Sequence, residues 1–97
     1  MARNQKLTAV LKGREAAQVN ASADPLVITF SDGSVMTVRL GAPAPQPLTL
    51  GTVSAVRQKD CELVFLYQDG RSLTLVTAEA TSCVLLRDRA GVLEYAD

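Results

Sequence analysis

The chain has 97 residues, of which ten are basic and ten acidic, and it contains no histidine. This length fits one domain around one core, and a hydrophobic fraction of 47% is typical of a folded chain. The formal net charge of zero argues against general polyanion binding, which normally needs a basic excess. The N-terminal segment has no apolar run long enough for a signal peptide or a membrane span, so we expect a cytoplasmic protein without membrane contact.

The first two segments differ in how clearly they can be interpreted. LTAVLK at residues 7–12 resembles VSAVRQ at 53–58, and both are predicted to be strands. Residues 13–23, GREAAQVNASA, lie between the first strand and the next apolar run. Their alanines favour a short helix, whereas their Gly, Asn and Ser residues favour a long loop, and both alternatives stay open.

Two segments have an Asp-Gly pair between apolar runs. They are LVITFSDGSVMTV at 26–38, with Asp32-Gly33, and ELVFLYQDGRSLTL at 62–75, with Asp69-Gly70. Asp-Gly between apolar runs is a strong hairpin signal, because a two-residue type I′ turn needs positive φ at both central positions. Glycine adopts positive φ freely, and aspartate tolerates it better than most residues. Each segment is therefore predicted to be a β-hairpin.

A two-residue turn in the second hairpin also predicts which side chains share a face. Leu66 would then lie opposite Leu73, and one face would be wholly apolar and consist of Val64, Leu66, Leu73 and Leu75. The other face would carry Leu63, Phe65 and Tyr67, interleaved with Ser72 and Thr74. Because strands that are apolar on both sides are usually covered on both sides, we expect a closed sheet, a second sheet or a partner subunit.

The similarity between the two hairpins predicts an internal repeat. The turns align at an offset of 37 (69 − 32 = 37), and the upstream segments align at an offset of 46 (53 − 7 = 46). We interpret this as a duplicated strand–link–hairpin unit in residues 7–40 and 53–77, joined by the proline-rich connector GAPAPQP at 41–47. The alternative is an ordinary β-meander without duplication.

The C-terminal part completes the predicted fold. Residues 77–82 are expected to be a loop or one helical turn, and residues 83–96 a third hairpin. Its turn, Asp88 to Gly91, fits a type I turn followed by a left-handed glycine. Residues 1–97 are thus predicted to form one all-β domain of about seven antiparallel strands, in a small sandwich or partly open barrel.

The residues that usually carry catalysis are missing. Without histidine there is no Ser-His-Asp or Cys-His nucleophile system and no common general base. Cys61 and Cys83 cannot complete a usual structural zinc site, and they are expected to be small buried thiols or a disulfide pair. Asp32 and Asp69 have a role in the turns rather than as a carboxylate pair. We therefore predict a protein that is not an enzyme and has no catalytic residues, metal or cofactor.

The leading functional hypothesis is a non-catalytic protein–protein interaction or assembly module, whose partner is itself or another protein. The alternative is a small β-barrel that binds single-stranded nucleic acid, with Phe65 and Tyr67 on one face and Arg57 and Arg71 near its rim. A carrier of a small ligand ranks third. The same four residues are the candidate interaction surface.

Overall fold

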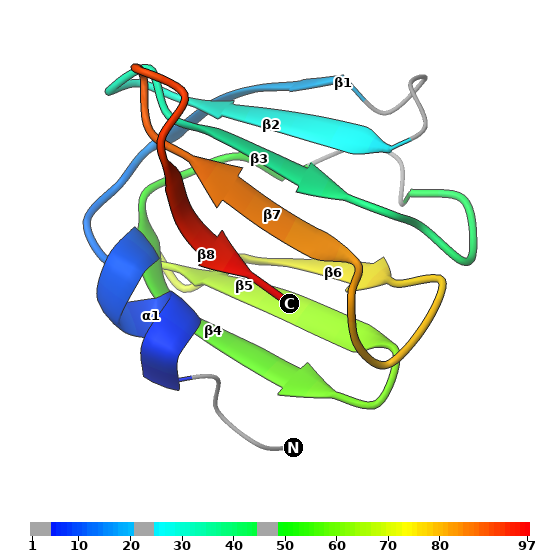
Figure 1. The fold of residues 1–97 in the computed structure, drawn as a ribbon. Helices are drawn as coiled ribbons and strands as arrows, with labels where there is room; N and C mark the ends of the chain where they lie inside the picture. The colour runs from blue at the N-terminus through cyan, green and yellow to red at the C-terminus, as the bar shows by residue number, and fades with distance from the viewer. Residues whose placement is uncertain (1–4, 21–24, 45–48) are drawn as a thin grey trace.

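The computed structural model describes residues 5–20, 25–44 and 49–97, which form two antiparallel β-sheets and one short helix (Figure 1). The predicted all-β sandwich is confirmed, and these described residues contain eight strands rather than about seven. The five-stranded sheet has the order β1-β2-β3-β7-β8, and the three-stranded sheet has the order β4-β5-β6. In chain order the elements are α1 (Gln5–Leu11), β1 (Ala16–Asn20), β2 (Leu26–Phe30), β3 (Val35–Val38), β4 (Val53–Lys59), β5 (Glu62–Tyr67), β6 (Ser72–Val76), β7 (Val84–Arg87) and β8 (Leu93–Ala96).

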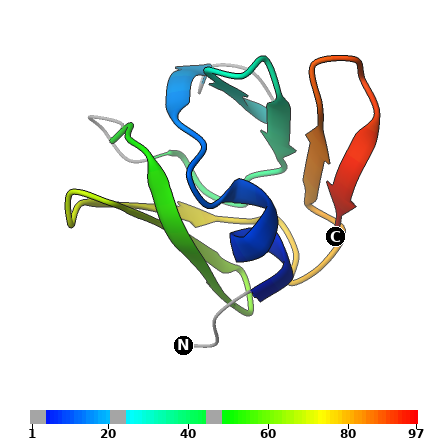
Figure 2. The same ribbon diagram turned by 90° about the vertical axis from the view of Figure 1, so that its left-hand side faces the viewer.

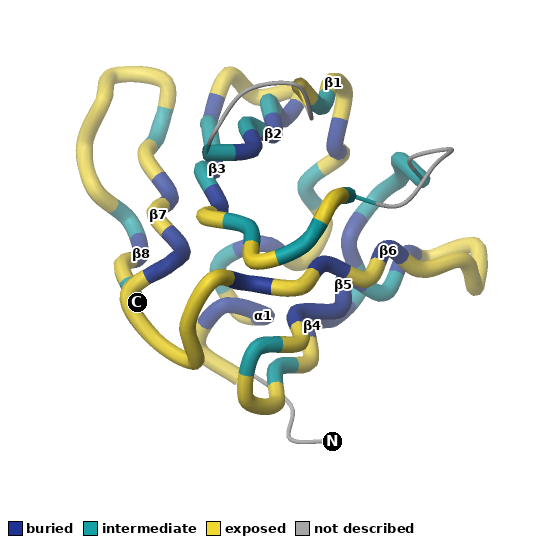
Figure 3. Tube along the Cα trace, turned by 90° about the vertical axis from the view of Figure 1, so that its right-hand side faces the viewer, coloured by how far each residue is buried: buried dark blue, intermediate teal, exposed yellow. Residues whose placement is uncertain are grey.

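The hydrophobic core lies between the two sheets and includes one side of the helix (Figure 3). Figure 2 shows α1 between the three-stranded sheet and the β7–β8 hairpin. Leu7 and Leu11 are fully buried because residues four apart lie on the same side of a helix. The Thr8 hydroxyl donates a hydrogen bond to the Val56 carbonyl oxygen (3.1 Å) and accepts one from the Val56 amide (2.8 Å). The helix thus covers β4 with apolar side chains and satisfies the amide and the carbonyl group of Val56.

The structure corrects the prediction for the N-terminal segments. The predicted strand at residues 7–12 is wrong, because residues 5–11 form α1. The predicted segment at 13–23 is described up to residue 20, and this part is neither a short helix nor a long loop, since it contains strand β1; residues 21–23 lie outside the described residues. This strand pairs with β2, and its register shifts between Ala16 and Gln18. A strand of low intrinsic preference forms here because β2 supplies the pairing edge, so tertiary context decides its conformation.

The turns lie where Asp-Gly indicated, but their type differs from the prediction. Tyr67 N donates to Arg71 O (2.9 Å) and Gly70 N donates to Tyr67 O (3.1 Å). Gly70 has a φ of 89°, whereas Asp69 does not have a positive φ. This pattern is a type I turn closed by a left-handed glycine at a bulge, with a three-residue loop instead of a two-residue loop.

The extra loop residue moves the register of the second hairpin by one position. Leu66 lies opposite Ser72 and Phe65 lies opposite Leu73, so the predicted Leu66–Leu73 pair is wrong. Because side chains alternate along a strand, a shift by one residue regroups the two faces. The face in the core consists of Leu63, Phe65, Tyr67, Leu73 and Leu75.

The connecting segments are loops. Residues 78–82 form bends without a helical turn, and Leu40 and Thr77 form an isolated antiparallel bridge. Of the predicted connector at 41–47, residues 45–47 lie outside the described residues.

Candidate functional site

The aspartates that the sequence singled out bind backbone groups of their own turns. Asp32 Oδ1 accepts a hydrogen bond from Ser34 N (2.9 Å), and Asp69 Oδ1 accepts one from Arg71 N (3.0 Å). Asp88 Oδ1 accepts hydrogen bonds from the amides of Ala90 and Val92, both at 2.9 Å. The glycines of these turns, Gly33, Gly70 and Gly91, all have a φ between 87° and 90°. These six predicted positions therefore build the three hairpin turns.

The predicted interaction surface is not assembled as expected. Phe65 is 2% exposed and Tyr67 is 4% exposed, so both rings belong to the core. Tyr67 Oη donates a hydrogen bond to Thr49 O (2.7 Å), and burial raises the pKa of this phenol to about 12. Arg57 and Arg71 are exposed, but no exposed ring from this set lies beside them. A stacking platform for bases made from Phe65 and Tyr67 is thus excluded by their burial.

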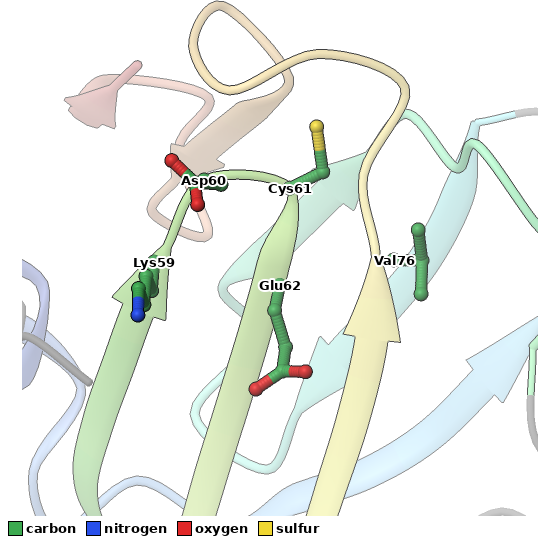
Figure 4. Close-up of a pocket in the computed structure, with 5 residues that line it drawn as sticks. All are labelled: Lys59, Asp60, Cys61, Glu62 and Val76. Carbon is green, nitrogen blue, oxygen red and sulfur yellow. The ribbon is translucent and has the colours of Figure 1, made fainter.

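A surface depression of about 340 Å³ lies at the turn between β4 and β5 and is lined by Lys59, Asp60, Cys61, Glu62 and Val76 (Figure 4). Asp60 has a φ of 50°, which is unusual for a residue other than glycine. Cys61 is partly exposed, and Figure 4 shows its thiol and the Glu62 carboxylate pointing in opposite directions. None of the other four side chains drawn in Figure 4 points toward the sulfur.

The two cysteines do not form the disulfide that the sequence left open, since both are free thiols. Cys83 is buried, and its Sγ accepts a hydrogen bond from Glu79 N at 3.3 Å. Within the described residues, no group of three or more Cys, Asp or Glu side chains could hold a metal ion. The thiol of Cys83 also donates a hydrogen bond to the Glu79 carbonyl oxygen at 3.6 Å, so Cys83 holds the backbone of the 78–82 loop.

A cluster of charged side chains joins three separate elements. Arg14, which lies between α1 and β1, forms a two-pronged ion pair with Glu94 of β8, with both N–O distances at 2.8 Å. Its Nε also lies 3.6 Å from Asp32 Oδ2 in the β2–β3 turn. These three residues, with Ser34, Asp88 and Arg89, line a depression of about 350 Å³.

The cluster shifts the pKa values of its own members. The hydrogen bond from Arg14 lowers the pKa of Glu94, and hydrogen bonds from Ser34 lower the pKa of Asp32. The hydrogen bond to Glu94 raises the pKa of Arg14. All three groups are thus held in their charged forms, which is the behaviour of a structural ion pair rather than of a proton donor near neutral pH.

Among the described residues, the two most exposed large apolar side chains, Val92 and Leu93, are on the last hairpin. Leu85 is opposite Ala96 and Arg87 is opposite Leu93, so these four side chains share the outer face of β7 and β8, which we call the hairpin face. Leu85 is 43% exposed and Leu93 is 47% exposed, and Val92 in the adjoining turn is 61% exposed. The inner face of the same hairpin contributes Val84, Leu86 and Tyr95 to the core, and Figure 3 shows the resulting alternation along β7.

A third depression extends the hairpin face. It has a volume of about 370 Å³ and is lined by Ser82, Val84, Leu85, Ala96 and Asp97. Sequence reasoning identified the hairpin at 83–96 but not this surface. The signal was present, since the two strands of this hairpin carry apolar residues on both faces. Which of the two faces points to the core depends on the neighbouring strands, and the sequence alone does not show that.

Comparisons with protein-family models, curated proteins and solved structures find no match for this chain. Nowhere in the described ranges is there a helix long and apolar enough to cross a bilayer. The function must therefore be argued from the surfaces described above.

Proposed function

We propose that the chain is a non-catalytic protein–protein interaction module that contacts its partner through the hairpin face. The observation that supports this most directly is the position of the exposed large apolar side chains. Among the described residues these are Val76, Leu85, Val92 and Leu93, and three of the four belong to the β7–β8 hairpin. A grouped apolar surface beside one arginine, Arg87, is the composition that protein interfaces favour.

The position of the hairpin in the sheet also supports a protein partner. β8 is the last strand of the five-stranded sheet, so a partner strand could extend the sheet at this edge. The two free cysteines agree with a reducing compartment, and we propose a cytoplasmic location. The nucleic-acid alternative loses its aromatic support because Phe65 and Tyr67 are buried.

Site-specific photo-crosslinking in cells that produce the native protein tests this proposal. A photoreactive amino acid is placed at Leu93 and, as the matched control, at Val76, because the two side chains are 47% and 44% exposed. We expect protein adducts from position 93, and we expect an excess of wild-type protein to suppress them by competition. An excess of the double variant Leu85→Ser, Leu93→Ser should not suppress them. Equal adducts from positions 76 and 93, or none from position 93, would contradict the proposal.

A further inference from the structure

Each sheet contains a three-stranded meander, β1-β2-β3 in one and β4-β5-β6 in the other. The strands of the two meanders pair at equivalent residues, which differ by a constant number of positions. In the first, Ala16 pairs with Phe30, and in the second Val53 pairs with Tyr67, so both partners are shifted by 37 (53 − 16 = 37; 67 − 30 = 37). The next pairs are also shifted by 37, and they are Gln18–Thr29, Val19–Ile28 and Asn20–Val27 against Ala55–Leu66, Val56–Phe65 and Arg57–Val64. Each ladder has its irregularity at the same place, between Ala16 and Gln18 and between Val53 and Ala55.

The pairs within the two hairpins have the same offset of 37 residues. Leu26 pairs with Val38, and Leu63 pairs with Leu75 (63 − 26 = 37; 75 − 38 = 37). Both turns are closed by equivalent hydrogen bonds, from Phe30 N to Ser34 O and from Tyr67 N to Arg71 O. Similar turns alone give similar hairpins, but they do not set the position of an irregularity in a third strand.

The contacts between the meanders have the form that a two-fold axis produces. Two isolated antiparallel bridges join them, Glu15–Thr52 and Leu40–Thr77, and in each bridge a residue pairs with its own equivalent (52 − 15 = 37; 77 − 40 = 37). The hydrogen bonds beside the bridges are reciprocal and join equivalent groups. They run from Ala16 N to Gly51 O and from Val53 N to Arg14 O, and from Gly41 N to Val76 O and from Ala78 N to Arg39 O. A self-complementary contact of this kind is the property of an isologous interface.

Inner-face side chains that are 37 residues apart are also buried to a similar extent. Equivalent side chains on the inner faces are buried in both meanders, and all are at most 4% exposed. The pairs are Leu26 and Leu63, Ile28 and Phe65, Phe30 and Tyr67, Met36 and Leu73, and Val38 and Leu75. The core is therefore largely a contact between two equivalent apolar faces.

We infer that residues 14–41 and 51–78 are two copies of one meander unit, and that the inner face of each copy is an interaction surface whose partner is a second copy of the same unit. The offset is 37 throughout, so the offset of 46 for residues 7–12 does not belong to the repeat. Among the described residues, helix α1 and the β7–β8 hairpin have no counterpart in the other half; α1 covers β4, and β7 pairs with β3. This inference does not depend on the partner proposed for the hairpin face.

A reciprocal exchange within the full chain tests the equivalence. Residues 26–38 are replaced by the sequence of 63–75, and 63–75 by the sequence of 26–38, so composition and total core volume are conserved. We expect a native β-sheet circular dichroism spectrum and a cooperative urea transition with a lowered midpoint, because equivalent positions then receive side chains of the right polarity. The matched control exchanges 26–38 with 64–76, which changes the offset by one residue and turns apolar side chains outward.

The control is expected to lose its cooperative transition. The inference is overturned if the exchange at an offset of 37 fails to fold, or if the exchange at an offset of 38 unfolds at the same urea midpoint. Because the readout is folding of the isolated chain, its outcome is separate from the crosslinking test of the hairpin face.

Discussion

Gly33 and Gly70 occupy equivalent turn positions but have different surroundings. Their φ values are 90° and 89°, in the left-handed region where a residue with a Cβ atom is strained. A Cβ at Gly70 would meet nothing within 4 Å, whereas a Cβ at Gly33 would lie 2.9 Å from Arg89 Cβ. Because Arg89 Cβ is attached directly to the backbone, it cannot move aside without shifting the β7–β8 turn. The first turn is thus in close contact with the last hairpin, and the second turn is not.

This difference predicts unequal effects of two alanine substitutions. Gly70→Ala is expected to lower the free energy of unfolding by about 1–2 kcal/mol, the cost of the left-handed conformation. Gly33→Ala is expected to cost roughly 1 kcal/mol more, because it adds the steric contact with Arg89. Urea denaturation followed by circular dichroism measures both values. Equal losses would show that the β2–β3 and β7–β8 turns separate easily.

At the scale of elements, the Arg14 cluster attaches the β7–β8 hairpin to the rest of the five-stranded sheet. Arg14 is 19% exposed and Glu94 is 25% exposed, so the pair is only partly screened by water. A partly buried two-pronged ion pair is stronger than the usual surface pair. Its other contact, with Asp32, adds the β2–β3 turn to the same cluster.

The cluster predicts acid-sensitive stability. The pKa of Glu94 is lower in the folded state than its ordinary value of 4.5. Its contribution to the free energy of unfolding is therefore complete above pH 4.5 and is lost as the pH falls through the pKa of the folded state. Glu94→Gln is expected to cost about 1–2 kcal/mol at neutral pH, because the charged hydrogen bonds are weakened. The loss of stability on acidification should then be smaller in this variant than in the wild type.

Urea denaturation at several pH values between neutrality and the acid range measures this difference. Glu62→Gln is the control, because Glu62 is an exposed carboxylate outside the cluster. Identical pH profiles for the wild type and Glu94→Gln would show that the ion pair adds nothing to the fold.

Much of the architecture, but little of the surface, could be predicted from the sequence. The Asp-Gly pairs located two turns because few residues other than glycine adopt positive φ. They did not define the register, because Asp-Gly fits both a two-residue turn and a type I turn with a left-handed glycine. The prediction of a strand at residues 7–12 rests on the similarity of LTAVLK to VSAVRQ at 53–58. That similarity does not show that Leu7 and Leu11, four residues apart, are buried on one side of a helix. The hairpin face could not be identified, since Leu85 and Leu86 are adjacent and both apolar, and only the fold shows that Leu86 points inward.

At the scale of the whole molecule, the two thiols differ in their exposure to solvent. Cys61 is partly exposed in the β4–β5 turn, whereas Cys83 is 5% exposed and lies directly before β7. The carbonyl oxygen of Cys83 accepts a hydrogen bond from Arg39 N, which extends the pairing of β3 with β7. Because Cys83 directly precedes β7, an interior strand of its sheet, we expect its thiol to become accessible when β7 separates from β3.

Thiol labelling therefore measures whether the molecule opens as one cooperative unit. In native buffer, Cys61 is expected to react faster than Cys83, because only open molecules expose Cys83. The labelling rate of Cys83 is then the rate of the exposed thiol multiplied by the fraction of molecules that are open. In a Cys61→Ser variant, the free energy of opening calculated from Cys83 labelling should match the free energy of unfolding, and its urea dependence should match the global m-value. A much smaller urea dependence would mean that the β7–β8 hairpin detaches while both meanders stay folded. That outcome would place the cooperative unit in the two meanders alone, with the hairpin as a separately attached element.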